Sequence, residues 1–285
     1  MIFWIASYPK SGNTWLRALI SSYYYSKDGR FLKNTIEKID QFPRKKYFDY
    51  FDYDPKIIQD TSRFWISAQK RINEDKNIKF FKTHNAFGEL NKQRFTNKEN
   101  TIGAIYIIRD PRNVITSLKN HYEMNDDQAL EWMTNTKQYI YDERNFKEDG
   151  FGSFQFLSSW EINYKSWKSQ NQIPLKIIRY EDLLDETFLV FKEIVEFINK
   201  TLNSQKSLNK EKLKNAVQST SFHNLKTHEK NYGFSEAISS KKKNDKIPFF
   251  FLGPENDWKK ILNDEQAKKL TNIFEKNLKE FSYTK

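Results

Sequence analysis

A short polar segment near the start of the chain carries residue types that bind phosphate-like oxyanions. The segment, Ser7–Trp15, holds one lysine, Lys10, and one glycine, Gly12. An apolar run, Ile2–Ala6, precedes it, and a helical pattern follows it. A helix start offers unpaired backbone N–H groups and partial positive charge, and a glycine lets the backbone close around an anion. Lys10 adds a full charge, so the segment predicts an oxyanion cradle.

The order of the loop residues argues against a nucleoside triphosphatase. The triphosphatase loop places its lysine after the second of two glycines, whereas Lys10 precedes Gly12 and no second glycine lies upstream. A lysine inside the loop can reach a bridging oxygen, where leaving-group charge develops. A nucleotide kinase or ATPase would also need acidic Mg²⁺ ligands, which are not evident. The turn residues alone would also fit a strand-turn-helix that binds no ligand.

Further polar residues follow the apolar segments later in the chain. His84 comes directly after a short strand pattern, and a neutral imidazole can take a proton from a hydroxyl at neutral pH. Arg109 ends another strand pattern, and Ser117 stands eight residues further on. An arginine fork and a serine hydroxyl at that spacing can face one phosphate. Taken singly, these residues also fit a surface histidine, a salt bridge from Arg109 to Asp110 and a plain helix-surface serine.

Strands that alternate with helices place these groups at one edge of a sheet. Strands are expected at Ile2–Ser7, Lys79–Lys82, Gly103–Ile108 and Leu175–Arg179. Helices are expected at Thr14–Tyr25, Ser62–Asn73 with Ser62 as N-cap, Arg112–Tyr122, Asp126–Tyr141, Ser153–Ser169, from Tyr180 to about Lys200, Lys210–Ser219 and after the capping box Asn263–Gln266. The pattern predicts an α/β fold with a central parallel sheet flanked by helices and a P-loop-like strand-loop-helix. Ligands then lie at the carboxyl ends of the strands.

The composition bounds the class of protein. The 285 residues are enough for one α/β domain with a sizeable core or for two small domains, and we expect a single domain over residues 1–285. A net charge of +11, from 48 basic against 37 acidic residues, favours an anionic ligand. No nucleic-acid-binding motif, metal-ligand set, signal peptide or membrane span is evident. The chain has no cysteine, which excludes disulfides and thiolate catalysis. We therefore expect a cytoplasmic protein that acts without nucleic acid, metal or membrane.

As a string, Ser7–Trp15 closely resembles the 5′-phosphosulfate loop of the sulfotransferases that use 3′-phosphoadenosine 5′-phosphosulfate (PAPS). The resemblance extends in the family's order to Lys259. It implies that the loop residues bind the donor: Lys10, Ser11, Gly12, Asn13, Thr14 and Trp15. Lys82–His84 is similar to the family's Lys-x-His, which implies that His84 is the general base and that Lys82 also contacts the transferred group. Arg109 and Ser117 match the family's 3′-phosphate motif.

Two weaker matches imply an adenine site. Tyr180, within a Tyr-Glu-Asp sequence, corresponds to a tyrosine near the adenine. Thr220–Phe222 resembles the family's Thr-Ser-Phe, which implies that Thr220 belongs to the donor site and that Phe222 covers one face of the adenine. Trp15 would then stack on the other face, since a purine packs well between aromatic planes. Core packing is the ordinary interpretation of a lone aromatic residue.

The last motif departs from the family pattern, an Arg-Lys-Gly group before Gly-Asp-Trp-Lys. Gly253 and Asp257–Lys259 match, but Phe251 and Leu252 stand at the cationic positions and Asn256 at the second glycine. Gly253 would still offer a backbone N–H to the 3′-phosphate, and Lys241–Lys243 could compensate for the missing cations. A catalytically impaired nucleotide-binding protein therefore stays open as an alternative, beside a P-loop nucleotide kinase.

The resemblance implies transfer of a sulfuryl group from PAPS to a hydroxyl or amine of a small-molecule or carbohydrate acceptor. Lysines would neutralise charge in place of a metal. We expect the acceptor site to draw on Lys27–Thr61, a loop region with short helices, on Phe87 and its neighbours, on Tyr122–Tyr141 and on Lys226–Pro248. The last segment is lysine-rich and is expected to be mobile. Neither the acceptor nor the oligomeric state is readable from the sequence.

Overall fold

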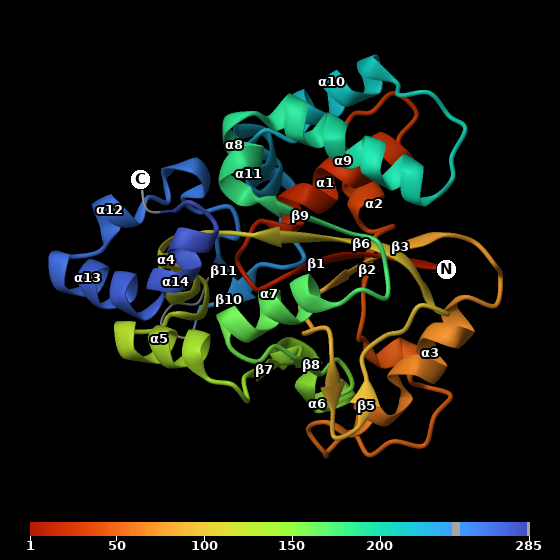
Figure 1. The fold of residues 1–285 in the computed structure, drawn as a ribbon, viewed down its shortest axis with the longest axis horizontal. Helices are drawn as coiled ribbons and strands as arrows, with labels where there is room; N and C mark the ends of the chain where they lie inside the picture. The colour runs from red at the N-terminus through yellow and green to blue at the C-terminus, as the bar shows by residue number, and fades with distance from the viewer. Residues whose placement is uncertain (241–245, 284–285) are drawn as a thin grey trace.

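A five-stranded parallel sheet forms the centre of the molecule (Figure 1), in the strand order β2-β3-β1-β6-β9. The structure is a computed structural model and describes residues 1–240 and 246–283. The strands are β1 (Ile2–Ser7), β2 (Asp40–Gln41), β3 (Lys79–Thr83), β6 (Thr101–Ile108) and β9 (Leu175–Arg179). The predicted α/β fold with a parallel sheet is confirmed. The sequence did not reveal β2, because a two-residue edge strand has no periodicity.

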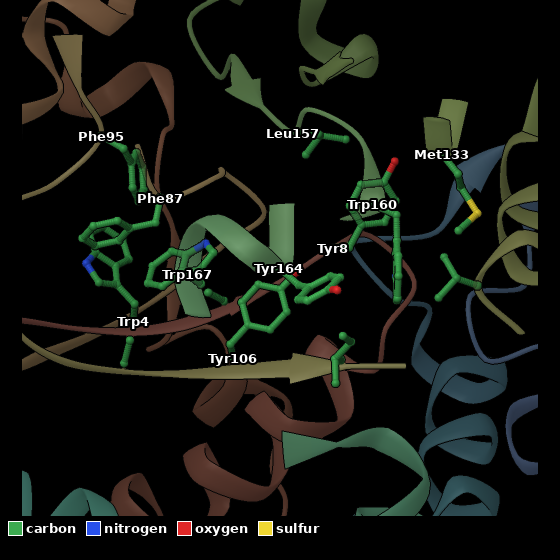
Figure 2. Packing of buried hydrophobic residues seen from close by; sticks show 14 of the residues in the cluster. Trp4, Tyr8, Phe87, Phe95, Tyr106, Met133, Leu157, Trp160, Tyr164 and Trp167 are labelled. Carbon is green, nitrogen blue, oxygen red and sulfur yellow. The ribbon is translucent and has the colours of Figure 1, made fainter. Parts of the chain in front are cut away.

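The sheet is apolar on both faces, as a parallel sheet between helices must be. Phe3 and Ile5 of β1 pack toward α1 (Asn13–Tyr25), α9 (Thr187–Thr201) and α10 (Lys210–Ser219). Trp4 and Ala6 belong to the core on the opposite face, which α7 (Trp160–Ser169) covers. Figure 1 shows these helices above and below the sheet, and Figure 2 shows Trp160, Tyr164 and Trp167 of α7 lying over Tyr106 of β6. Each fully buried aromatic side chain contributes about 1.5–3 kcal/mol, so this sheet is a firm base for the loops at its edge.

The remaining elements surround this framework. The other α-helices are α2 (Lys33–Ile36), α3 (Trp65–Ile72), α4 (Pro111–Tyr122), α5 (Asp126–Thr134), α6 (Phe146–Asp149), α8 (Tyr180–Asp185), α11 (Phe222–Tyr232), α12 (Trp258–Ile261), α13 (Asp264–Ile273) and α14 (Glu275–Glu280). Short antiparallel pairs join β4 (Glu89–Leu90) to β5 (Gln93–Arg94), β7 (Tyr139–Ile140) to β8 (Gln155–Phe156), and β10 (Ile238–Ser239) to β11 (Lys246–Ile247). Within the described ranges, no helix is both long and apolar enough to cross a bilayer.

Two predicted helices are wrong over part of their length. The helix expected to reach Tyr141 ends at Thr134, and the helix expected from Ser153 begins at Trp160. The intervening residues include the antiparallel pair of β7 and β8, which we call the β7–β8 hairpin, with a 3₁₀ turn (Glu143–Asn145) and α6 between its strands. Its strand β8 is held by the segment after β3: the Phe156 N–H donates to Asn85 Oδ1 at 2.8 Å, and the Ala86 N–H donates to the Phe156 carbonyl at 2.8 Å. These distant partners outweigh the local helical pattern.

Two smaller expectations also changed. Ser62 is not a helix cap, because it lies inside a 3₁₀ turn (Asp60–Phe64) that runs directly into α3. The segment expected to be mobile, Lys226–Pro248, begins instead inside α11. The capping box at Asn263–Gln266 is confirmed as the start of α13.

Candidate active site

The phosphate loop turns tightly between β1 and α1. Asn13 donates its side-chain N–H to the Ile5 carbonyl at 3.0 Å and to Ser7 Oγ at 3.2 Å, which fastens the loop to the end of β1. Gly12 is the N-cap of α1, with φ 97° and ψ 10°, and Lys10 also has a left-handed φ of 65°. The first backbone bond of α1 runs from the Leu16 N–H to the Gly12 carbonyl. The N–H groups before Leu16 therefore precede the helical ladder and are available to an anion.

Both the positive φ and the lack of space for a side chain require a glycine at position 12. A Cβ at this position would lie 2.5 Å from Cδ2 of Tyr180, whose ring covers the loop. We predict that Gly12→Ala lowers the free energy of unfolding by about 1–3 kcal/mol. It should also lower the affinity for adenosine 3′,5′-bisphosphate (PAP) at least about tenfold, because a loss of roughly 1.4 kcal/mol in binding free energy is a tenfold change in affinity. Thermal unfolding and titration calorimetry measure the two effects. Gly88→Ala is the control, since a Cβ at Gly88 would meet nothing within 4 Å. A G12A variant that matches G88A in both measurements would contradict the prediction.

His84 is buried at the end of β3 and is oriented from several sides. Its Nδ1 lies 2.8 Å from the Ser7 carbonyl, which only accepts, so Nδ1 carries the proton and Nε2 keeps its lone pair. The His84 N–H donates to Gln155 Oε1 at 2.8 Å, and the His84 carbonyl accepts from Asn163 Nδ2 at 3.0 Å. Burial, together with the nearby charge of Lys82, lowers the pKa of His84 to about 3. The imidazole is therefore neutral at pH 7, as a base must be.

Lys10 is a buried cation beside the loop. Its Nζ lies 4.2 Å from the centroid of the Phe249 ring. Burial lowers the pKa of Lys10 to about 7, with further lowering by Lys82 and Arg109 and an opposing effect from Glu236. An anion bound in the loop would favour the charged form of Lys10.

A carboxylate meets the cations of this site, in a group that we call the Glu236 cluster: Thr14, Arg17, Lys82 and Glu236. Glu236 accepts from Thr14 Oγ1 at 2.9 Å, from Lys82 Nζ at 3.1 Å and from Arg17 Nη1. Burial alone would raise the pKa of the Glu236 carboxyl, but Lys82 and Arg17 outweigh it and hold that pKa well below its usual range. Burial lowers the pKa of Lys82, against the influence of Glu236.

Arg109 and Ser117 line the same cavity from the end of β6 and from α4. Arg109 donates from Nη1 to the Lys10 carbonyl at 3.2 Å and lies over the Tyr180 ring, with Cζ 4.2 Å from its centroid. Its Nε is buried and has no hydrogen-bond partner among the described residues. The salt bridge considered between Arg109 and Asp110 does not form, because Asp110 pairs with Arg112 at 2.7 Å. Arg109 thus keeps donor capacity for a phosphate.

The residues expected around the adenine lie near one another, with one exception. Trp15, Tyr180 and Phe222 all line the cavity, and the Trp15 and Tyr180 rings meet edge to face with centroids 5.7 Å apart. Gly253, expected at the 3′-phosphate, lines the cavity too. Thr220 does not line it: its hydroxyl is buried and donates to the Ala216 carbonyl at 2.8 Å.

Ser11 also stays out of the cavity lining, although it belongs to the phosphate loop. Its side chain is fully buried, and its Oγ has no partner among the described residues. A buried hydroxyl without a partner in this loop fits an oxyanion site.

The last motif, which departs from the family pattern, is held against α4 by Asn256, the residue at the position of its second glycine. Asn256 accepts from Thr116 Oγ1 at 2.8 Å and donates to the Asn113 carbonyl at 2.8 Å. Phe251, at a cationic position of the family pattern, is 43% exposed and lines the cavity. Lys241–Lys243, expected to compensate, lie outside the described residues.

The cavity has a volume of about 1230 Å³, and both the loop and His84 line it. A group of mostly aromatic and amide side chains also lines it. They are Gln41, His121, Tyr122, Trp132, Gln138, Tyr139, Tyr141, Gln155 and Phe249. Of the regions expected to contact an acceptor, Tyr122–Tyr141 supplies many of these residues, and Phe87 is not among them.

Sequence reasoning missed four residues of this site: Arg17, His121, Gln155 and Glu236. Gln155 was placed inside a helix, and Glu236 was placed in a mobile segment. Glu236 did carry one weak indication, an acidic residue between Phe234 and Ile238 in an otherwise lysine-rich stretch. Among the residues that the structure describes, no three His, Cys, Asp or Glu side chains come close enough to hold a metal ion.

Comparison with known proteins agrees with this geometry. The sulfotransferase domain model matches residues 2–282. Luciferin sulfotransferase of Photinus pyralis is 21% identical over 286 residues, covering 98% of this chain and 72% of that protein. Amine sulfotransferase of Oryctolagus cuniculus is 23% identical over 279 residues, covering 97% of this chain and 80% of that protein.

Solved structures share the fold. A mouse sulfotransferase complexed with PAP superposes with a TM-score of 0.58 at 18% identity, over 98% of this chain and 84% of that one. Retinol dehydratase in a complex with retinol and PAP gives 0.60 at 15% identity, over 98% of this chain and 81% of that one. The family model covers nearly the whole chain in addition to this shared fold. The chain therefore belongs to the PAPS-dependent sulfotransferase family.

Proposed function

We propose that this protein transfers the sulfuryl group of PAPS to a hydroxyl or amine of a small-molecule or carbohydrate acceptor, with His84 as the base. One observation carries the proposal: the bond from His84 Nδ1 to the Ser7 carbonyl leaves the lone pair of Nε2 for the cavity. The same cavity is lined by the phosphate loop, Lys10 and Arg109. Donor, base and acceptor space therefore meet in one place.

The transfer is a single in-line displacement. The acceptor oxygen or nitrogen forms a bond to sulfur, and its proton passes to His84 Nε2. The bond between sulfur and the bridging oxygen breaks, and its electron pair stays on that oxygen, which leaves as part of PAP. Lys10 stabilises the charge that develops on the bridging oxygen, and Lys82 assists. Such group transfer depends mainly on positioning and electrostatics.

Arg109 and Ser117 would hold the 3′-phosphate, and Trp15 and Phe222 the adenine. The unpaired buried Nε of Arg109 supports the first assignment, because it leaves a charged donor for an oxyanion. Phe222 lies directly against Gly253, where a Cβ would come within 2.2 Å of its ring. Gly253 thus keeps Phe222 at the cavity wall.

The aromatic part of the cavity wall supports an acceptor with a flat ring or a sugar face. The Tyr122 and Trp132 rings stack with centroids 4.9 Å apart and an interplanar angle of 26°. Burial and the charge of Lys10 lower the pKa of His121 to about 2, so this imidazole is neutral and can exchange hydrogen bonds with an acceptor. Aromatic faces with a few polar groups are typical of small-molecule sites.

The proposal is tested by incubating the purified protein with labelled PAPS and a panel of phenols, alcohols, amines and sugars. Label transfer to one class, together with PAP binding by calorimetry, would support it. No transfer to any acceptor and no binding of PAP would refute it. Transfer that fails while PAP binds tightly would favour a binding protein without catalysis.

The pKa of Lys10 makes a prediction about pH. Only the charged form attracts the donor, and that form is lost from the free protein as the pH rises through about 7. A bound anion raises the pKa of Lys10, so PAP binding takes up a proton above this pH. We expect PAP affinity to fall by up to about tenfold per pH unit there. Calorimetry in buffers of different ionisation enthalpy measures the uptake, and a Lys10→Met variant should lack it. Equal uptake in both proteins would contradict the assignment.

We further propose that residues 2–282 act as one catalytic unit, since the family model spans them, and that the protein works in the cytoplasm. A relative from Arabidopsis thaliana that is 24% identical bears the name cytosolic sulfotransferase 15, which supports the second point. Fractionation of expressing cells tests the cytoplasmic location, and recovery of the protein in the membrane fraction would refute it.

A further inference from the structure

The Glu236 cluster is a ready-made oxyanion site beside the phosphate loop. Three donors converge on one carboxylate: Thr14 Oγ1 at 2.9 Å and the guanidinium of Arg17, both from α1, and Lys82 Nζ at 3.1 Å from β3. Thr14, Lys82 and Glu236 line the cavity. Glu236 comes from the segment after α11, far away in the chain. The oxygens of the Glu236 carboxylate mark the position where these donors would hold the oxygens of another anion.

Arg17 is fixed in place independently of Glu236. It lies three residues after Thr14 on α1, so both side chains project from one face of the helix. Its Nη2 donates to the Ile39 carbonyl at 3.0 Å, and the residue is only 7% exposed. Its Nε is buried without a partner among the described residues. A guanidinium anchored to the backbone keeps its direction when its carboxylate partner leaves.

The cluster lies close to both the base and the lysine of the loop. Thr14, Lys82 and Glu236 line the same cavity as His84 and Lys10. Lys82 and Glu236 influence the pKa values of both His84 and Lys10. Lys10 itself points to the Phe249 ring. Since the acceptor is deprotonated at His84, the group under attack must lie near the cluster.

We propose that Thr14, Arg17 and Lys82 bind the oxygens of the sulfuryl group, and that the Glu236 carboxylate holds their place until the donor arrives. The inference rests on the proposed function and adds Arg17 as a positioning residue for the transferred group. A sulfuryl group presents three oxygens, which suits three donors. Two anions cannot share these donors without repulsion, so Glu236 must withdraw when PAPS binds.

The first test compares the affinities of PAPS and PAP for the wild type and Glu236→Gln, by calorimetry without acceptor. PAP lacks the sulfuryl group. Charge-assisted hydrogen bonds are strong enough that removing the competing carboxylate should tighten PAPS binding about tenfold or more, and PAP binding much less. Glu186→Gln is the control, since Glu186 is an exposed carboxylate at the junction of α8 and α9. It should change neither affinity.

The second test uses the double variant R17Q/E236Q, which removes both charges of the buried pair and is useful even if E236Q is poorly folded. If Arg17 holds the sulfuryl group, the ratio of PAPS affinity to PAP affinity should be lower in the double variant than in the wild type. PAP affinity should stay close to the wild-type value. Circular dichroism confirms that each variant is folded.

The outcomes separate the two proposals. A gain that is equal for PAPS and PAP, no gain at all, or an unchanged PAPS preference in R17Q/E236Q would overturn the inference alone. A wild type that binds neither nucleotide would overturn the proposed function, and the inference with it.

Discussion

A His84→Gln variant is expected to lose about 10²- to 10⁴-fold in kcat, the range typical of a general base. Glutamine is neutral and of comparable length, but its amide cannot take a proton from the acceptor. The loss should appear in kcat and leave PAP affinity nearly unchanged, because the proposed function places His84 beside the acceptor and not beside the nucleotide. Steady-state kinetics with labelled PAPS and calorimetry with PAP measure the two quantities.

The matched control for this variant is His223→Gln. His223 is exposed on α11, and its removal should leave kcat unchanged. If H84Q keeps more than about a tenth of wild-type kcat, the loss falls below the usual range for general-base catalysis and His84 is not the base. Burial keeps His84 unprotonated across the neutral range, so the defect should persist at every pH in that range.

A Lys10→Met variant is expected to lower kcat about 10²- to 10³-fold, as the loss of a group that stabilises developing charge does. Methionine has an apolar side chain of comparable length and can still lie against Phe249. It cannot stabilise the bridging oxygen as the bond to sulfur breaks. PAP affinity should also fall, because PAP keeps the 5′-phosphate that bears this oxygen.

The kinetic pattern distinguishes a catalytic role of Lys10 from simple binding. If K10M raises KM and leaves kcat unchanged, Lys10 stabilises the bound donor and the transition state equally and contributes to binding alone. Lys38→Met is the control: this exposed lysine also lies over an aromatic ring, with Nζ 5.5 Å from the centroid of Tyr25. It should leave both parameters unchanged.

The sequence predicted those parts of the site whose positions depend on local order along the chain. Lys10 and Gly12 lie between a strand and a helix, and His84 and Arg109 directly follow strands. In a parallel sheet those strand ends meet at one edge, so the strand pattern alone brings the residues together. The roles assigned to them stay predictions, to be decided by the variants above.

The parts that could not be predicted depend on contacts between distant residues. Glu236 meets Thr14 across 222 positions of sequence, and no local pattern encodes such a contact. Arg17 stands in an apolar helix, where a single arginine looks like a surface residue. Gln155 was assigned to a helix because the contacts that hold β8 as a strand come from distant residues. Asn85, for example, accepts from the N–H of Phe156, the next residue after Gln155, across 71 positions of sequence. The salt bridge considered for Arg109 failed because Asp110 also caps α4 and is taken by Arg112.

The β7–β8 hairpin connects the proposed base to the proposed acceptor wall. One of its strands presents Gln155 to the backbone of His84, and its other strand carries Tyr139 on the wall where an acceptor would rest. Substitutions that reshape β8 are therefore expected to disturb His84 together with the acceptor wall. Within the described residues, neither Tyr139 nor Tyr141 forms a hydrogen bond with His84, so substitutions there are expected to leave its orientation intact. If the proposed function holds, acceptor preference should be easier to change through β7 and the residues just after it than through β8.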